Sequence, residues 1–96
     1  MEILRIHHAV PAFDAWKRAF DSDPLNRKTG GVRRYQIQRS ISDPSFVMID
    51  MHFDTRIQAE AFLQNLNRLW EGPARAFVKS PQAWILETIE SGRSDP

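Results

Sequence analysis

The alternating stretch at residues 46–53 constrains the fold of this chain more than any other feature. Its odd positions are all apolar, whereas its even positions include Asp50 and His52. This period of two is typical of a β-strand that turns one side to the core and the other side away from it. The apolar set is Val47, Ile49, Met51 and Phe53. The chain is therefore expected to form a sheet that other elements cover on one side.

Two helices are predicted from apolar residues at helical spacing. The first stripe is Phe13, Trp16 and Phe20, and the second is Ala59, Phe62, Leu63, Leu66, Leu69 and Trp70. Thr55 and Gln58 before the second stripe have the spacing of a capping box, in which each side chain satisfies a free amide of the other residue. Gly72 and the proline after it are expected to end that helix.

The remaining pattern completes a β-α-β-β-α-β order. Strands are expected at 3–10, 32–39, 46–53 and 83–90. Asp23-Pro24 predicts a short helical turn that runs to Thr29, and 74–81 is expected to be an irregular connection. This order predicts a ferredoxin-like α+β fold, with a four-stranded antiparallel sheet and both helices on one face. We expect a single domain over residues 1–90 and a short polar tail at 91–96.

The composition limits the possible functions. The chain has 96 residues and no cysteine, which allows one compact domain and excludes disulfide scaffolds and thiolate metal sites. Thirteen Lys and Arg against twelve Asp and Glu give a net charge of +1, too little to attract nucleic acid or an anionic membrane. The first ten residues do not resemble a signal peptide, and no apolar run reaches the ~18 residues that span a bilayer. A cytoplasmic protein is expected.

Two helices cover only one side of a four-stranded sheet, so the other side needs its own explanation. By parity, the side chains on this open face are Arg5, His7, Asp50 and His52. In this topology the first and third strands are antiparallel neighbours, so Arg5 can lie opposite Asp50 as an ion pair. The strand at 32–39 is expected to add Arg34, Gln36 and Gln38 to this face, and to place Tyr35 and Ile37 beneath the helices.

An open sheet face of this kind can contact water, single-stranded RNA or the same face of a second subunit. RNA-binding sheets carry exposed aromatic residues for base stacking and a basic-Gly-aromatic motif on the third strand. Residues 45–50 contain no glycine, and Asp50 would repel phosphate. RNA binding is therefore disfavoured, and no nucleic-acid partner is expected.

A series of short motifs spans residues 4–90. They are His8-x-Val10, Phe13-Asp14-x-Trp16 with Phe20, Gly30-Gly31, Arg39 with Asp43-Pro44, Phe53-Asp54 and Ala61-Phe62-Leu63. This series resembles small proteins of the antibiotic biosynthesis monooxygenase-like superfamily. The resemblance implies a homodimer whose open faces pack together as an α+β barrel, and a ligand cavity between helices and sheet in each subunit. One departure is Ala12, where relatives often have an acidic helix cap.

Members of this superfamily include cofactor-independent monooxygenases that oxidise polycyclic phenols to quinones. This chemistry needs an apolar cavity, a base or hydrogen-bond partner for the phenol, and aromatic residues that orient the rings. The candidates are His8 and Tyr35 for catalysis, Trp16, Phe20, Phe62 and Trp70 for the pocket lining, and Arg5, His7, Asp50 and His52 for the barrel lining and dimer interface. The resemblance thus implies a small aromatic or hydrophobic ligand and no bound cofactor.

The same residues also have structural interpretations. His8 lies on the apolar side of its strand, where we favour a core histidine that is hydrogen-bonded to backbone. The aromatic residues can simply fill the space under the helices, which would leave a non-catalytic ligand-binding or regulatory dimer. Cavity volume separates these hypotheses, because a void of about 300 Å³ or more favours a ligand.

Haem and metal chemistry are two further alternatives. The haem-degrading pattern requires an Asn on the first strand and a haem-ligating His after the second helix, and this chain has neither. His7, Asp50 and His52 could approximate a two-His-one-carboxylate metal site. A polar barrel lining, in which Arg5 holds Asp50 and His52 bonds across the dimer, is preferred, and no metal is expected.

Overall fold

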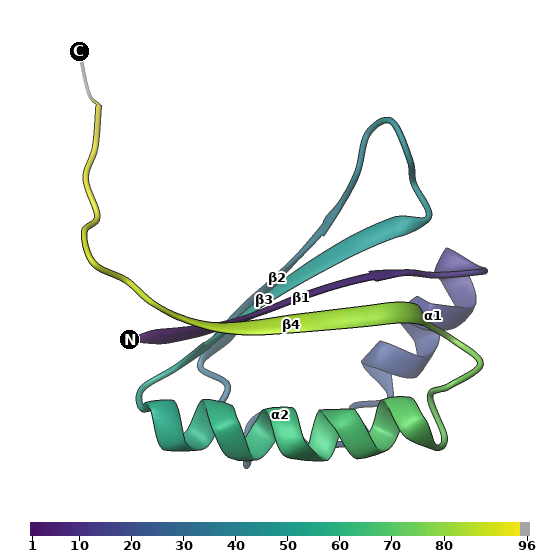
Figure 1. The fold of residues 1–96 in the computed structure, drawn as a ribbon, viewed down its shortest axis with the longest axis horizontal. Coiled ribbons are helices and arrows are strands. Elements are labelled where there is room, and N and C mark those ends of the chain that lie inside the picture. The colour runs from purple at the N-terminus through teal and green to yellow at the C-terminus, as the bar shows by residue number, and fades with distance from the viewer. Residues whose placement is uncertain (95–96) are drawn as a thin grey trace.

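The computed structural model describes residues 1–94 of the chain. Two helices and four strands follow one another in the predicted β-α-β-β-α-β order (Figure 1). The strands are β1 (Glu2–Ala9), β2 (Arg34–Arg39), β3 (Phe46–Phe53) and β4 (Lys79–Glu87), and the helices are α1 (Phe13–Asp21) and α2 (Arg56–Glu71). The strand order in the sheet is β2-β3-β1-β4, and all neighbours are antiparallel. The predicted ferredoxin-like α+β fold is confirmed.

The core lies between one face of the sheet and the helices. The alternating side chains of β3 reach this face as predicted, because every second residue of a strand points the same way. The buried apolar residues of β1 and β3 are Leu4, Ile6, Val47, Ile49, Met51 and Phe53. Figure 1 shows α2 running along this side of the sheet. Tyr35 and Ile37 of β2 pair with Met51 and Ile49, so they face the helices as expected.

The start of α2 is fixed by the predicted capping box. Thr55 Oγ1 accepts a hydrogen bond from the Gln58 amide at 3.2 Å, and the Thr55 amide donates to Gln58 Oε1 at 3.3 Å. Three apolar residues of the helix, Ala59, Phe62 and Leu66, are then buried at 0%, 4% and 8% exposure. The two bonds and this burial explain why α2 begins and faces the sheet where it does.

Helix α1 stands farther from the sheet than α2 does. In the described part of the chain, no Cα atom of α1 comes within 8 Å of a Cα atom in another helix or strand. The helix is held instead by large side chains: the rings of Trp16 and His8 are 5.4 Å apart, and those of Phe20 and Tyr35 are 5.3 Å apart. Ala12, which precedes α1, has no side-chain oxygen to cap it. Because large side chains bridge the distance between α1 and the sheet, space remains beneath this helix.

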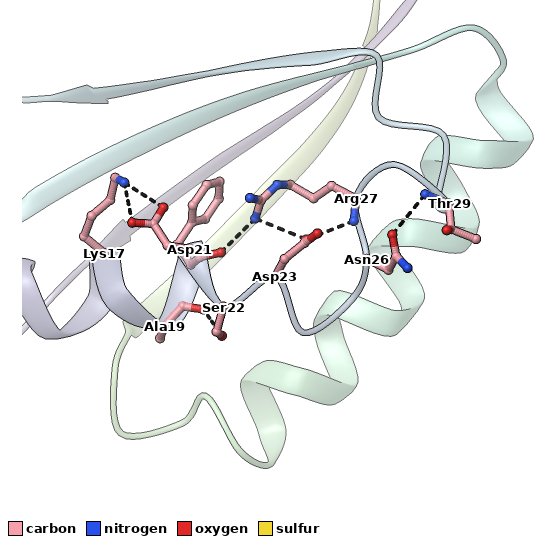
Figure 2. Close-up of polar contacts among 9 residues, drawn as sticks. Lys17, Ala19, Asp21, Ser22, Asp23, Asn26, Arg27 and Thr29 are labelled. Carbon is pink, nitrogen blue, oxygen red and sulfur yellow. Dashed lines mark hydrogen bonds and ion pairs between the residues drawn. The ribbon is translucent and has the colours of Figure 1, made fainter.

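The segment between α1 and β2 corrects one prediction. Asp23 does not start a helical turn, because its φ of 54° is in the left-handed region, as is the φ of 53° at Asn26. Residues 22–31 form a series of turns. Asp23 Oδ1 accepts from the Arg27 amide at 2.9 Å, and Arg27 Nη1 donates to the Phe20 carbonyl at 2.8 Å (Figure 2). These bonds hold a tight loop in place of the expected helix.

Strand β4 also differs from its expected position, since it begins at Lys79 rather than at residue 83. Its pairing with β1 is irregular between His7 and Ala9, and Pro81 lies at this irregularity. A proline has no amide to donate, which an outer strand tolerates. Strand β2 begins at Arg34, two residues later than expected, and residues 88–94 carry no secondary structure. Of the expected polar tail at 91–96, the last two residues lie outside the described part.

Candidate functional site

A cavity of about 220 Å³ lies between the helices and the covered face of the sheet. We call it the inner cavity. Its walls come from β1, α1, β3, α2 and the two connections that follow the helices. It is lined by Ile6, His8, Trp16, Ala19, Phe20, Ser22, Asp23, Pro24, Leu25, Arg27, Ile49, Met51, Phe62, Leu66, Leu69, Trp70, Pro73, Ala74, Phe77 and Val78. Ser22, Pro24 and Pro73 are exposed, so the cavity opens to solvent between the two connections.

All four residues predicted to line the pocket do line the inner cavity. They are Trp16, Phe20, Phe62 and Trp70. Trp16 and Phe20 are neighbours on one face of α1, with ring centroids 5.4 Å apart. Phe62 and Trp70 come from α2, so the two helices provide aromatic walls on different sides of the same space.

His8 brings a polar group to this apolar cavity. Its side chain is 2% exposed, and its ring meets Trp16 edge-on at 5.4 Å and Trp70 at 6.5 Å. Within residues 1–94, the buried Nδ1 atom has no hydrogen-bond partner. Burial lowers the pKa of His8 to about 4, a backbone hydrogen bond opposes the shift, and the charge of His7 adds to it. His8 is therefore a neutral base at neutral pH.

Tyr35, the other catalytic candidate, lies elsewhere. It belongs to β2 at the edge of the sheet, is 44% exposed, meets the Phe20 ring edge-on at 5.3 Å, and does not line the inner cavity. The structure therefore does not bring Tyr35 and His8 together. Parity placed both residues on the covered face, and both are there, but β3 separates their strands.

Several lining residues were not found by sequence reasoning. Leu25 lies in the connection after α1, and Phe77 and Val78 lie in the connection after α2. Neither connection has a periodic pattern. The only sequence signal for these lining residues is that they are isolated apolar residues in polar loops. Such residues often pack inward and close a site.

The open face carries the four residues predicted for the interface. Arg5 and Asp50 are directly paired in the register, with two hydrogen bonds between the guanidinium and the carboxylate. His52 pairs with Ile3, and His7 with Met48, on the same face. Burial lowers the pKa of His52, as does the charge of Arg34, while Asp50 opposes the shift. Both His52 and Asp50 are 8% exposed, although no helix covers them.

Apolar side chains surround these polar ones. The register places Ile3, Phe46, Met48, Trp84 and Leu86 on the open face. The His7 ring lies between Trp84, at 4.8 Å, and Phe46, at 5.7 Å. The buried Nε2 atom of His7 has no hydrogen-bond partner within residues 1–94. Trp84 remains 43% exposed, so this face combines apolar surface with unfilled hydrogen-bonding capacity.

Residues 1–94 contain no group of three His, Asp or Glu side chains that could hold a metal ion. His7, Asp50 and His52 share the open face, but their strand positions do not converge on one point. In the same part of the chain, neither helix is long and apolar enough to cross a bilayer.

Known structures share this fold. A protein of Nitrosomonas europaea, named provisionally as an antibiotic biosynthesis monooxygenase, matches with a TM-score of 0.70 and 19% identity over 94% of this chain and 100% of its own. SnoaB, a cofactor-independent oxygenase from Streptomyces nogalater, matches with a TM-score of 0.74 and 13% identity over 94% and 95% of the two chains. A variant of MhuD with two manganese protoporphyrin IX molecules bound per active site matches with a TM-score of 0.71 and 11% identity over 98% and 100%.

Comparison with the models of known protein families and with curated proteins finds no match. The structural matches show that the chain has the fold of the antibiotic biosynthesis monooxygenase-like proteins. The resemblance inferred from the sequence motifs is thus confirmed at the level of the fold.

Proposed function

We propose that this protein is a homodimer that binds a small aromatic molecule in each inner cavity and oxidises it without a cofactor. The observation that carries the proposal is His8, a neutral imidazole with an unpartnered nitrogen in the wall of an apolar cavity. An uncharged base in such a place can accept the proton of a phenolic hydroxyl. The match to SnoaB, a cofactor-independent oxygenase, supports the same chemistry on this fold.

The cavity limits the proposed ligand to a small molecule. Its volume of about 220 Å³ falls short of the ~300 Å³ at which drug-sized pockets begin, so it suits a molecule of one or two rings. Trp16 and Trp70 would contact the faces or edges of these rings, and both already lie against His8. The ligand hydroxyl would then approach the imidazole while the apolar walls exclude water.

The reaction that this arrangement supports is the oxidation of a phenol to a quinone by molecular oxygen. His8 takes the hydroxyl proton as a ring carbon forms its bond with O₂, and then returns this proton to the outer oxygen of the peroxide. The resulting hydroperoxide loses the hydrogen of that carbon, its O–O bond breaks, and water leaves. One oxygen atom becomes the new carbonyl and the other becomes water, so phenol and O₂ give quinone and water. No external reductant is required.

Oxygen consumption with a dihydroxynaphthalene under air tests this role of His8. The wild-type protein should consume oxygen and form a quinone, whereas His8→Ala should lose at least 90% of the turnover, since a general base contributes about 10²-fold or more. Glu60→Gln is the control, because this exposed position of α2 lies outside the cavity lining and away from the open face. Unchanged turnover in a folded His8→Ala variant would remove His8 from the mechanism.

A non-catalytic ligand-binding or regulatory dimer is the second candidate, and the modest volume of the cavity favours it. It predicts that the dihydroxynaphthalene quenches the fluorescence of Trp16 and Trp70 without any consumption of oxygen. Ala19→Phe would place a ring inside the lining and should abolish binding under either hypothesis. Binding that survives this substitution would exclude the inner cavity as the site.

The dimer is proposed to form through the open face. Two copies related by a two-fold axis would bury Trp84 and its apolar neighbours and offer partners to His7 and His52. The Arg5–Asp50 pair would become part of the barrel lining. Exposed apolar area without a covering helix supports this placement, because soluble subunits rarely leave such a patch uncovered.

A further inference from the structure

A second hollow, which we call the outer groove, adjoins the inner cavity at the segment between α1 and β2. It is lined by Asp23, Arg27, Lys28, Thr29, Gly31, Val32, Arg33, Arg34, Tyr35 and Gln58. Asp23 and Arg27 are the two residues that belong to both linings. A ligand that filled the inner cavity and extended past this pair would enter the outer groove.

Arg27 is held at this boundary in a fixed orientation. Its Nη1 atom donates to the Phe20 carbonyl at 2.8 Å and lies 3.4 Å from Asp23 Oδ1 (Figure 2). Its guanidinium carbon lies 4.0 Å from the centre of the Phe20 ring and 4.9 Å from that of Tyr35. Within residues 1–94, Nε and Nη2 of Arg27 have no hydrogen-bond partner. A guanidinium that is held on one side and free on the other is suited to bind a carboxylate.

The outer groove is strongly positive for a chain whose net charge is only +1. Its lining residues include Arg27, Lys28 and Arg33 against one carboxylate, that of Asp23, while the Arg34 side chain turns to the open face beside His52. Asp54 neutralises Arg33 at 2.6 Å, and Asp23 lies against Arg27. Lys28 has no ion pair in the described residues, so it leaves an uncompensated charge beside Arg27. This charge distribution favours an anion.

Aromatic rings connect the two polar ends of the site. The His8 ring is 5.4 Å from Trp16, the Trp16 ring is 5.4 Å from Phe20, and Phe20 is 4.0 Å from the Arg27 guanidinium. Along this row a neutral base stands at one end and a cation at the other. A matching ligand has an aromatic body, a hydroxyl group at the end near His8 and an anionic group at the end near Arg27.

We propose that the outer groove is an anion-binding subsite of the inner cavity, in which Arg27 and Lys28 bind a carboxylate carried by the aromatic ligand. The proposal rests on the proposed function only in taking the inner cavity as the place where the aromatic body binds. It narrows the ligand to a hydroxylated aromatic acid and makes Arg27 the residue that selects for the acid group.

Two probes of matched shape test this proposal. The first is 2-naphthol and the second is 6-hydroxy-2-naphthoate, and their dissociation constants are measured at neutral pH from the quenching of Trp16 and Trp70 fluorescence. The wild-type protein should bind the acid about tenfold more tightly than the neutral naphthol, because charge-assisted hydrogen bonds are the stronger kind. Arg27→Gln should abolish this preference and leave the affinity for 2-naphthol within about twofold. Lys28→Gln should reduce the preference partly.

Arg39→Gln is the matched control, since Arg39 also stacks on a ring, that of Phe13 at 4.5 Å, but lines neither hollow. It should keep the full preference for the acid. Equal binding of the two probes by the wild-type protein, or a preference that survives Arg27→Gln, would overturn the anion subsite and leave the proposed function intact. Failure of both probes to bind would overturn the inner cavity as a ligand site, and the subsite with it. Arg27→Lys keeps the positive charge. A loss of preference in Arg27→Gln that Arg27→Lys does not share therefore comes from the charge and not from a loss of the loop fold.

Discussion

Arg5 and Asp50 form a two-point ion pair across β1 and β3, with Nε to Oδ1 at 2.9 Å and Nη2 to Oδ2 at 3.0 Å. Asp50 as a residue is 8% exposed, although it lies on the face of the sheet that no helix covers. Bidentate geometry fixes both side chains, so the pair forms a rigid part of the proposed interface. A charge reversal at Asp50 would place two cations together there.

Asp50→Lys should therefore convert a dimer into a monomer, because like charges would face each other in an interface with little water. Sizing chromatography with light scattering measures this change. Glu60→Lys makes the same charge change on the exposed side of α2 and should leave the dimer intact. Trp84→Ser provides a second test with less risk to the fold, since Trp84 is already 43% exposed. Dimers in both open-face variants would contradict the placement of the interface.

The stability of the protein should decrease in mild acid because of His8. Its pKa is about 4 in the folded protein and about 6.5 in the unfolded chain, so the unfolded chain binds the proton first as the pH falls. The free energy of unfolding is thus unaffected by His8 above pH ~6.5 and falls by up to about 1.4 kcal/mol per pH unit between there and pH ~4. Urea unfolding of wild type and His8→Leu measures the difference. A variant with the same acid slope as wild type would show that His8 does not titrate in this way.

Thr55→Ala should lower the free energy of unfolding by about 1 kcal/mol, because it removes the side-chain oxygen that accepts the Gln58 amide at the start of α2. Thermal or urea denaturation measures the loss. Thr88→Ala, in the exposed segment after β4, is a control with the same chemical change and should have no measurable effect. Equal stability of the two variants would mean that the capping box contributes nothing.

Gly31→Ala should be more damaging than its small size suggests. Gly31 has a φ of 94°, which residues with a Cβ atom rarely adopt, and the added Cβ would lie 2.9 Å from the Gln58 side chain. We expect a loss of about 1–2 kcal/mol of unfolding free energy. Gly92→Ala, whose Cβ would meet no atom within 4 Å, is the control. A neutral result at Gly31 would show that the loop before β2 adapts to the change.

The sequence predicts the sheet and its two faces well because the information is local. The alternation over 46–53 assigns each side chain of β3 to a face, and the antiparallel pairing of β1 with β3 then follows from the topology. That is why Arg5 could be placed opposite Asp50. The capping box at Thr55 is likewise encoded within four residues.

The candidate site could be predicted only in part. The aromatic and apolar stripes of α1 and α2 supply part of the cavity wall, and the sequence predicts that part. The connections that contain Leu25 and Phe77 could not be placed, because a loop without periodic pattern depends on the tertiary contacts that hold it. Tyr35 shows a second limit: parity gives the face of a residue, but not its distance from His8 across the strand between them. The sequence does not distinguish Arg27 from a solvated surface charge, since its contacts with Phe20 and Tyr35 arise only in the folded loop.

The irregular pairing at Pro81 also affects how readily the sheet could aggregate through its edges. Strands β2 and β4 form the two borders of the sheet, where a foreign strand could add and begin an ordered aggregate. At Pro81 the β4 border lacks an amide hydrogen and departs from regular register. The β2 border carries Arg34 and Arg39. Both borders are therefore poor templates for strand addition, while the open face remains available to a second subunit.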